Sequence, residues 1–223
     1  MFCIGRTASA DQLQDERTRA FETAARIEAE WPLLGPGPVS DFVDVLGARL
    51  AEHAPAAPFP WRFIVFRHRD ANAFAIGGGR IYVSDGTVRT SRCEAEMAAI
   101  LAHEMGHELA GHFRPGQVRD RSGPGRGAGH VRIGSVMQEL DPAHEIEADR
   151  ISVDILRAAG YAPRAALDVA KRLSGRHSAG STPRDSARLA ALTSVVRKAP
   201  PEGRFDTAEF QRLRAELIDV ERE

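Results

Sequence analysis

The segment from residue 91 to residue 111 constrains this chain most, because it has the pattern of a long, partly buried helix. Ser91 followed three residues later by Glu94 matches a capping box, which predicts a helix that begins near Arg92. Gly111 is a typical stop signal. Between these ends, apolar side chains recur at every fourth position: Met97, Leu101, Met105 and Leu109. This spacing predicts that one side of the helix packs into the core.

The same segment contains the sequence His-Glu-x-x-His at His103, Glu104 and His107. Residues four apart lie one above the other on a helix, so both imidazoles can reach one Zn²⁺ ion. Glu104 then lies beside the ion, where it can accept a proton from metal-activated water. A pattern this short also occurs by chance in charged helices. A third ligand on a second helix would therefore decide between a metal site and a chance match.

A second acidic helix supplies a candidate for that third ligand. Asp141 is a suitable N-cap and Pro142 a suitable first helical residue, and Glu145 and Asp149 then share one face. Glu145 completes a His₂Glu site with an open fourth position, which is typical of catalytic zinc. Asp149 can accept the free ring N–H of a ligating histidine. Glu147 should face away, about 200° round the helix from Glu145. The alternative is that Glu145 and Asp149 form a solvent-exposed acidic face and bind no metal.

Three segments together resemble the zinc metallopeptidases of the CAAX prenyl protease and HtpX type, which belong to the gluzincins. The first is residues 103–107, His-Glu-Met-Gly-His, and the second is residues 145–150, Glu-Ile-Glu-Ala-Asp-Arg. The third is residues 72–83, in which Asn-Ala-Phe is followed by Gly-Gly-x-Ile-x-Val. The order and spacing of these motifs agree with the family from about residue 39 to residue 189.

The resemblance implies that the strand at residues 80–84 is a sheet edge that lines the catalytic cleft. A protein or peptide substrate would then bind as an added edge strand, through unpaired backbone groups. The residues implied in substrate binding are Asn72, Gly78, Gly79, Ile81 and Tyr82. A flexible hairpin connection is the alternative role for residues 77–79, and the two roles are compatible.

The family also places a His-Pro pair and an arginine downstream of the third ligand. In this chain the histidine position holds Thr182, so that electrophile for the oxyanion is missing. Arg188 matches the arginine and can either stabilise the oxyanion or form a bidentate ion pair with Asp149. His177 and Tyr82 are alternative donors.

Three other histidines near the motifs leave a His₃ site open as an alternative: His112, His130 and His144. His112 lies nine residues after His103, which is about 180° away if the helix continues. It is therefore a poor third ligand from the same helix.

Composition sets mild limits on fold and function. The chain has 223 residues and a net charge of −1, so bulk electrostatics give no reason to expect nucleic-acid binding. No run approaches the ~18 apolar residues that span a bilayer, in contrast to membrane-embedded family members but in agreement with soluble, single-domain relatives. We expect one metallopeptidase domain over residues 1–223, with a catalytic core at about 39–199 and terminal helices at 10–31 and about 206–221.

The fold class expected is α+β and zincin-like: a mainly helical domain with a small, antiparallel-edged sheet over the catalytic helix. Further helices are predicted at residues 11–30, 40–53, 163–173, 183–197 and 206–220, and strands at 61–67, 74–76 and 80–84. Ser40 is the expected cap of the second helix, and Asp85-Gly86 is a turn signal. The basic, Gly-rich residues 114–130 are expected to form a mobile surface loop, for which a solvated run, a selector of acidic substrates or a partner, and a lid are the alternatives.

The two cysteines are too few for a disulfide framework. Cys93 is expected to be a small buried side chain. Cys3 leaves two locations open. One is the cell envelope or periplasm, with a lipid anchor in a longer precursor, and the other is the cytoplasm.

The function predicted is that of a zinc metalloendopeptidase with one Zn²⁺ per chain, held by His103, His107 and Glu145, with Glu104 as general base. The alternative is a binding or chaperone-like module that keeps zinc but has a gated, weakly active or inactive site. The oligomeric state stays open.

Overall fold

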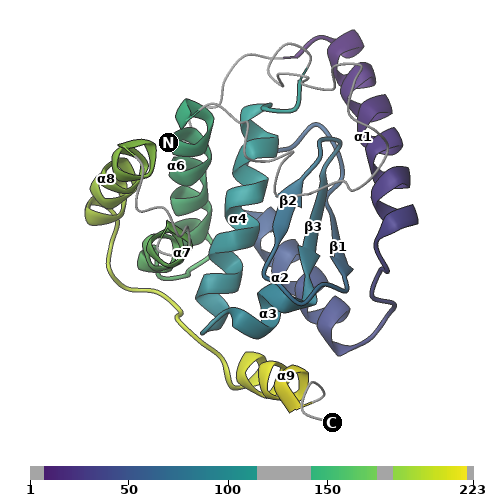
Figure 1. The fold of residues 1–223 in the computed structure, drawn as a ribbon. Coiled ribbons are helices and arrows are strands. Elements are labelled where there is room, and N and C mark those ends of the chain that lie inside the picture. The colour runs from purple at the N-terminus through teal and green to yellow at the C-terminus, as the bar shows by residue number, and fades with distance from the viewer. Residues whose placement is uncertain (1–7, 115–141, 175–182, 220–223) are drawn as a thin grey trace.

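The structure is a computed structural model, and it describes residues 8–114, 142–174 and 183–219 (Figure 1). Several residues considered above lie outside these ranges: Cys3, His130, Asp141, His177 and Thr182. Most of the predicted loop at 114–130 lies outside them too. The architecture is α+β and mainly helical, with one small sheet, as expected for a zincin-like fold.

The sheet has three strands, β1 (Arg62–Phe66), β2 (Ala73–Ala75) and β3 (Arg80–Ser84), in the order β1-β3-β2. β3 pairs in parallel with β1 and antiparallel with β2. The expectation that β3 is a sheet edge is therefore wrong, because its backbone is paired on both sides. The edges are β1 and β2. The burial of four successive residues of β3 fits this result, since strands covered on both faces read as continuous apolar runs.

Helices cover both faces of the sheet. α1 (Ala10–Glu30) lies on one face, where Ala24 and Ile27 join a cluster with Phe66, Phe74 and Tyr82. α2 (Pro38–His53) and α4 (Glu94–Ala110) pack on the other face in the main core (Figure 1). The sheet thus separates α1 from α4, which carries the His-Glu-x-x-His sequence.

α6 (Pro142–Ala158) packs along α4 on the side away from the sheet (Figure 1). α7 (Arg164–Ser174) also packs directly on α4, and α8 (Pro183–Lys198) packs on α6 and α7. The two central helices approach very closely at Gly106. A Cβ atom added there would lie 2.7 Å from the carbonyl oxygen of Ala148. Glycine at this position therefore lets α6 come close to α4.

The start of α4 differs from the prediction. Cys93 is the N-cap and makes no side-chain cap, whereas the Ser91 hydroxyl donates to the carbonyl of Thr87. The free N–H groups of α4 are bound instead by a segment more than 100 residues away. Glu94 N donates to Asp206 Oδ1 and Ala95 N donates to the Phe205 carbonyl, each at 3.0 Å. The prediction of a glycine stop is confirmed, since Gly111 has a left-handed conformation with φ 73°.

Two further local predictions were wrong. The Asp85-Gly86 turn is the start of a short helix, α3 (Asp85–Thr90), capped by Ser84. α2 begins at Pro38, two residues before the expected cap, with the proline in its first turn, and the hydroxyl of Ser40 donates to the carbonyl of Gly35 instead of capping the helix. The last helix, α9 (Ala208–Asp219), packs on α3. Among the described residues, no helix is long and apolar enough to span a membrane.

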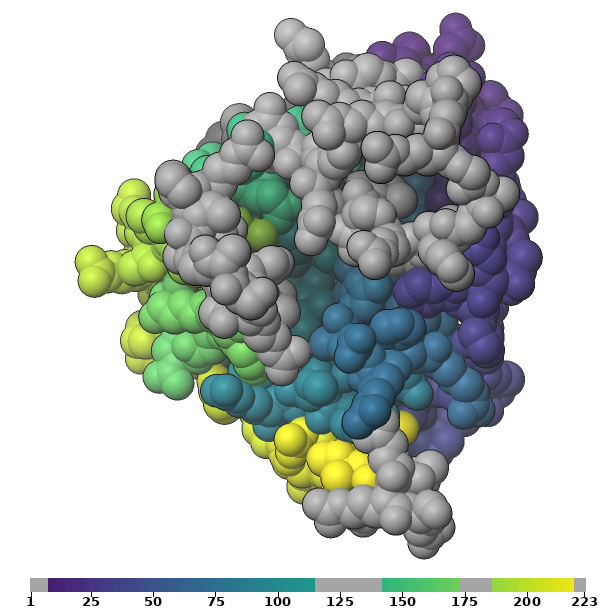
Figure 2. Space-filling view, in the orientation of Figure 1, coloured from purple at the N-terminus to yellow at the C-terminus, as the bar shows by residue number. Residues whose placement is uncertain are grey.

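The space-filling view shows the relation of these layers on one face of the molecule (Figure 2). The teal surface of α4 is visible between the green helices that follow it in sequence and the blue sheet region. Part of the α4 surface thus lies on this face, between the helical layer and the sheet.

Candidate metal centre

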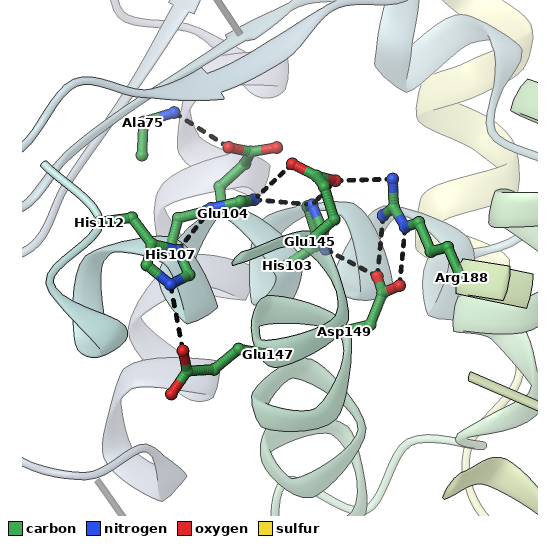
Figure 3. Close-up of polar contacts among 9 residues, drawn as sticks. All are labelled: Ala75, His103, Glu104, His107, His112, Glu145, Glu147, Asp149 and Arg188. Carbon is green, nitrogen blue, oxygen red and sulfur yellow. Dashed lines mark hydrogen bonds and ion pairs between the residues drawn. The ribbon is translucent and has the colours of Figure 1, made fainter. Parts of the chain in front are cut away.

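His103 and His107 lie one turn apart on α4, and their Nε2 atoms converge at 3.0 Å (Figure 3). Glu145, in the first turn of α6, faces the same point. Its carboxylate oxygens lie 3.5 Å from His103 Nε2 and 3.4 Å from His107 Nε2. The three ligand atoms all lie within 4.8 Å of one another. Two helices far apart in sequence thus bring two nitrogens and one oxygen to one place.

The other ring nitrogen of each histidine faces a polar side chain on the far side. His103 Nδ1 lies 3.0 Å from Asp149 Oδ1, and His107 Nδ1 lies 2.9 Å from His112 Nδ1. Each ring is therefore turned so that Nε2 is the atom left for a ligand. Two imidazole nitrogens and a carboxylate oxygen, with no cysteine, are a donor set that suits a catalytic zinc ion. The residues present fit such a metal.

The protonation pattern of this group also fits a cation. Burial acts to lower the pKa of His103, but hydrogen bonds with Asp149 and Glu145 outweigh it and raise that pKa to about 10. Burial acts to raise the pKa of Glu145, but the hydrogen bond from His103 dominates and lowers it to about 2. Burial and the charge of His103 lower the pKa of His107 well below its usual value. Without a metal, His103 thus carries a positive charge beside the negative charge of Glu145, and a metal ion would displace the proton from the ligand nitrogen.

Glu104 lies on the side of the group that faces the sheet (Figure 3). Its Oε2 accepts the backbone N–H of Ala75 in β2 at 3.0 Å, and its side chain is buried. Burial raises the pKa of Glu104 to about 7, and the charge of His103 opposes this rise. A carboxyl with a pKa near neutrality is suited to accept and return a proton.

Arg188 on α8 binds both carboxylates of α6. Its Nε and Nη2 donate to Asp149 at 2.7 and 2.9 Å, and its Nη1 lies 2.6 Å from Glu145 Oε2. Of the two roles left open by the sequence, this bidentate geometry favours the tie to Asp149. The same cation lies beside the ligand group, so it also offsets the charge of Glu145.

The five residues predicted to bind substrate do not line this group. Ile81 and Tyr82 are fully buried in the central strand, and the Tyr82 hydroxyl donates to Glu28 on α1 at 2.7 Å. The prediction of Tyr82 as an alternative oxyanion donor is therefore wrong, because its hydroxyl points to the opposite face of the sheet.

The glycines and Asn72 make internal contacts as well. The N–H groups of Gly78 and Gly79 donate to the carboxylates of Glu16 and Glu108. The backbone N–H of Asn72 donates to the Thr87 hydroxyl, and the Asn72 carbonyl accepts from that hydroxyl and from the backbone N–H of Ser84. These backbone groups hold the hairpin and are not free for a peptide.

Within the described parts of the chain, no other three acidic, histidine or cysteine side chains come together in this way. His112 and His144 stack on each other with ring centroids 4.1 Å apart, behind His107. They therefore do not form a His₃ site with His103 and His107. As predicted, Glu147 faces away from the ligand group (Figure 3).

The contact between His112 and His107 was not predicted from the sequence. The projection from His103 assumed that the helix continues, whereas the left-handed Gly111 turns the chain back. His112 N then donates to the His107 carbonyl, and the ring folds against His107. In the sequence, the one sign of this contact was a glycine helix stop followed directly by a histidine.

Comparison with known proteins bears on the class of this site. Residues 42–121 match Peptidase family M48. The matched region includes β1 to β3 and all of α4, while Glu145 and Arg188 lie beyond it. The chain is 26% identical over 195 residues to the beta-barrel assembly-enhancing protease of Escherichia coli, with 70% of this chain and 40% of that protein covered.

Two further relatives carry protease names. The mitochondrial metalloendopeptidase OMA1 of Arabidopsis thaliana is 30% identical over 126 residues, with 51% of this chain and 26% of that protein covered. Metalloprotease LoiP of Escherichia coli is 32% identical over 122 residues, covering 47% of this chain and 48% of that protein. The chain thus spans less than half the length of each of these relatives. The matches support a metallopeptidase of family M48 and a metalloprotease as the class of enzyme.

Proposed function

We propose that this chain is a zinc-dependent endopeptidase that hydrolyses peptide bonds of proteins or peptides. The observation that carries the proposal is the convergence of His103 Nε2, His107 Nε2 and the Glu145 carboxylate, with Glu104 buried next to them. The similarity to named metalloproteases supports it. The finer assignment to the CAAX prenyl protease and HtpX type rests on the three sequence motifs and is part of the proposal.

Zn²⁺ bound by His103, His107 and Glu145 would polarise the scissile carbonyl and acidify water. The side chains then have separate tasks. Glu104 accepts a proton from the attacking water and passes it to the departing amine, for which a pKa near 7 is well suited. Asp149 holds the ring of His103, and Arg188 holds Asp149 and offsets the charge of Glu145.

The peptide would bind along β2 rather than β3. β2 is an edge strand next to α4, and the N–H of Ala75 points away from β3 toward Glu104. By the alternation of an antiparallel pair, the backbone groups of Ala73 point the same way. An extended peptide that pairs with the Ala73 backbone and the Ala75 carbonyl, while the Ala75 N–H stays with Glu104, would lie between β2 and the ligand group. This proposal replaces the strand addition to Ile81 and Tyr82.

The first experiment measures metal content by mass spectrometry in wild type, His103→Ala and Glu145→Ala, beside cleavage of casein or a fluorogenic peptide. We expect one zinc per chain in wild type and a loss of both zinc and chelator-sensitive cleavage in the variants. Full zinc content in the Glu145→Ala variant would show that Glu145 is not a zinc ligand. Zinc bound normally without any cleavage would favour the alternative of a gated binding or chaperone-like module.

Glu104→Gln separates catalysis from metal binding. The amide oxygen of glutamine can still accept the Ala75 N–H, so the fold and the zinc content should be retained. A proton acceptor is lost, and we expect turnover to fall by about 10² to 10⁴-fold. Turnover at the wild-type rate would show that Glu104 is not the general base.

The cell-envelope or periplasmic location stays a prediction, as does its cytoplasmic alternative. Cys3, the residue that suggested a lipid anchor, lies outside the described residues.

A further inference from the structure

His112 lies directly behind the candidate ligand His107. The two Nδ1 atoms are 2.9 Å apart, and both side chains are buried, with 0% of His107 and 2% of His112 exposed. On its other side, His112 Nε2 lies 3.3 Å from Glu147 Oε2 on α6. A continuous path of contacts therefore runs from the ligand atom of His107 through two imidazole rings to a carboxylate (Figure 3).

Only one arrangement of protons satisfies all of these contacts when both rings are neutral. His107 Nε2 faces His103 Nε2 and Glu145, so it must present its lone pair to a metal. The proton of His107 then lies on Nδ1 and is donated to His112 Nδ1. His112 in turn carries its proton on Nε2, where it is donated to Glu147. The carboxylate thus determines the tautomer of both rings.

The ring of His112 is held in place from three directions. The left-handed Gly111 turns the chain, and His112 N donates to the His107 carbonyl at 3.1 Å. The His144 ring stacks on it at 4.1 Å with an interplanar angle of 17°, and Glu147 binds its far nitrogen. Because the His112 ring is held in this way, it can hold the His107 ring in one orientation.

The two candidate histidine ligands are supported differently. His103 reaches a carboxylate directly, since its Nδ1 lies 3.0 Å from Asp149. The Nδ1 atom of His107 reaches a carboxylate through His112. A ligating histidine commonly gives its second N–H to a carboxylate, carbonyl or water, and loss of that partner weakens metal binding. Here a second histidine occupies the partner's place.

We propose that His112 is a positioning residue that fixes the tautomer and orientation of His107 for metal binding, with Glu147 fixing the tautomer of His112. This inference rests on the proposed metal site, because it concerns one of its ligands. It gives α6 two tasks, since Glu145 faces the metal group and Glu147 braces the opposite side of His107.

Two substitutions at one position test the proposal. Asparagine places its amide oxygen near the position of Nδ1 and can still accept from His107, whereas leucine has no acceptor. We expect His112→Leu to lower zinc affinity by about 10 to 100-fold in chelator competition. His112→Asn should recover most of that loss. The exposed His53→Leu, at the end of α2, is the control and should bind zinc as wild type does.

Nitrogen-15 NMR of the histidine rings supplies a readout apart from affinity and activity. We expect His107 to be protonated at Nδ1 and His112 at Nε2 in the zinc-loaded protein. Urea unfolding of each variant reports whether the fold is retained. Wild-type zinc affinity in a folded His112→Leu protein would overturn the proposal, as would equal losses in the leucine and asparagine variants.

Failure of the proposal and failure of the proposed function are distinguishable. If the wild-type protein binds zinc but cleaves no peptide, the peptidase function is contradicted. The expected effect of His112 on zinc affinity can still be measured in that case. Cleavage with unchanged affinity in His112→Leu contradicts the positioning role alone. A wild-type protein that binds no zinc overturns both.

Discussion

At the scale of single residues, Arg188 is the cation on which two buried carboxylates depend. Glu145 and Asp149 are one turn apart on α6, and the guanidinium contacts both at 2.6 to 2.9 Å. Burial acts to raise the pKa of Asp149, yet the hydrogen bond from Arg188 and its charge hold that pKa well below its usual range. Removal of the cation would leave two negative charges in a largely buried place, with His103 left to offset them when no metal is bound.

Arg188→Met should therefore destabilise the protein most when no metal is bound. Methionine keeps part of the apolar stem, so the change isolates the charge and its hydrogen bonds. We expect a loss of about 2 kcal/mol or more in the free energy of unfolding with chelator present. Saturating zinc should restore part of it, because a metal ion supplies positive charge to Glu145 at the same place.

The matched control is Arg157→Met on the same helix. Arg157 pairs with Asp154 at 3.4 Å on the surface, and such a pair contributes about 0.5 kcal/mol or less. Urea unfolding of wild type and both variants, with chelator and with zinc, gives the loss in unfolding free energy for each variant under each condition. Equal losses for the two arginines, or no recovery with zinc, would contradict the role assigned to Arg188.

At the scale of elements, the spacing of α4 and α6 depends on Gly106, which lies between the two histidine ligands. A Cβ atom at this position would lie 2.7 Å from the Ala148 carbonyl oxygen and 3.0 Å from its Cα, and a backbone does not yield as a side-chain end does. Gly106→Ala should push α6 away and move Glu145 from the histidines.

We expect Gly106→Ala to lower both stability and zinc affinity, with a loss of about 1 to 3 kcal/mol in the free energy of unfolding. Overpacking outweighs the gain in helix propensity that alanine usually brings. Gly35→Ala, in a loop where an added Cβ meets nothing within 4 Å, is the control. Calorimetry and chelator competition measure the two effects. A variant of Gly106 with unchanged zinc affinity would show that the helix spacing is not critical.

The start of α4 depends on a distant cap. Cys93 offers no side-chain cap, so the Glu94 N–H is satisfied by Asp206 at 3.0 Å. Asp206→Ala should cost about 1 kcal/mol of stability, the usual value of an N-cap. The exposed Asp15→Ala in α1 controls for the loss of an aspartate. Urea denaturation distinguishes them, and a loss no larger than that of the control would mean that the distant cap contributes nothing.

These elements show which parts of the fold and site were readable from the sequence. Local periodicity predicted β3 at its observed bounds and the ends of most helices within one or two residues. Helical spacing alone put Glu145 and Asp149 on one face of α6. The pairing of β3 on both sides was not readable, because strand partners are chosen by tertiary packing. The Asp206 cap was missed for the same reason, whereas the His112 contact was missed because the helix was assumed to continue past Gly111.

At the scale of the whole molecule, two buried carboxyl groups, one on α1 and one on α4, approach each other at the glycine hairpin, beyond the strands that separate the two helices. Glu16 is 2% exposed and Glu108 is 1% exposed. Gly78 N donates to Glu16 at 3.3 Å, and Gly79 N donates to Glu108 at 2.7 Å. Burial raises the pKa of Glu108 to about 8, and the negative charge of Glu16 adds to the rise.

This pKa implies that folding stability falls between about pH 5 and pH 8. An unfolded glutamate loses its proton near pH 4.3, whereas folded Glu108 keeps it until about pH 8. In that window the folded state binds the extra proton, so a rise in pH favours unfolding, by at most about 1.4 kcal/mol per pH unit. Above pH 8 this contribution levels off.

Glu108→Gln should remove that dependence, because a neutral amide has no proton to lose. The amide oxygen can still accept the Gly79 N–H, and the amide nitrogen can donate to Glu16. The variant should therefore gain stability relative to wild type as the pH rises from 5 to 8. Urea unfolding across this range, with chelator present so that metal binding adds no pH dependence, measures the difference. The exposed Glu22→Gln on α1 controls for a lost carboxylate, and parallel stability curves for wild type and Glu108→Gln would show that Glu108 does not hold the proton.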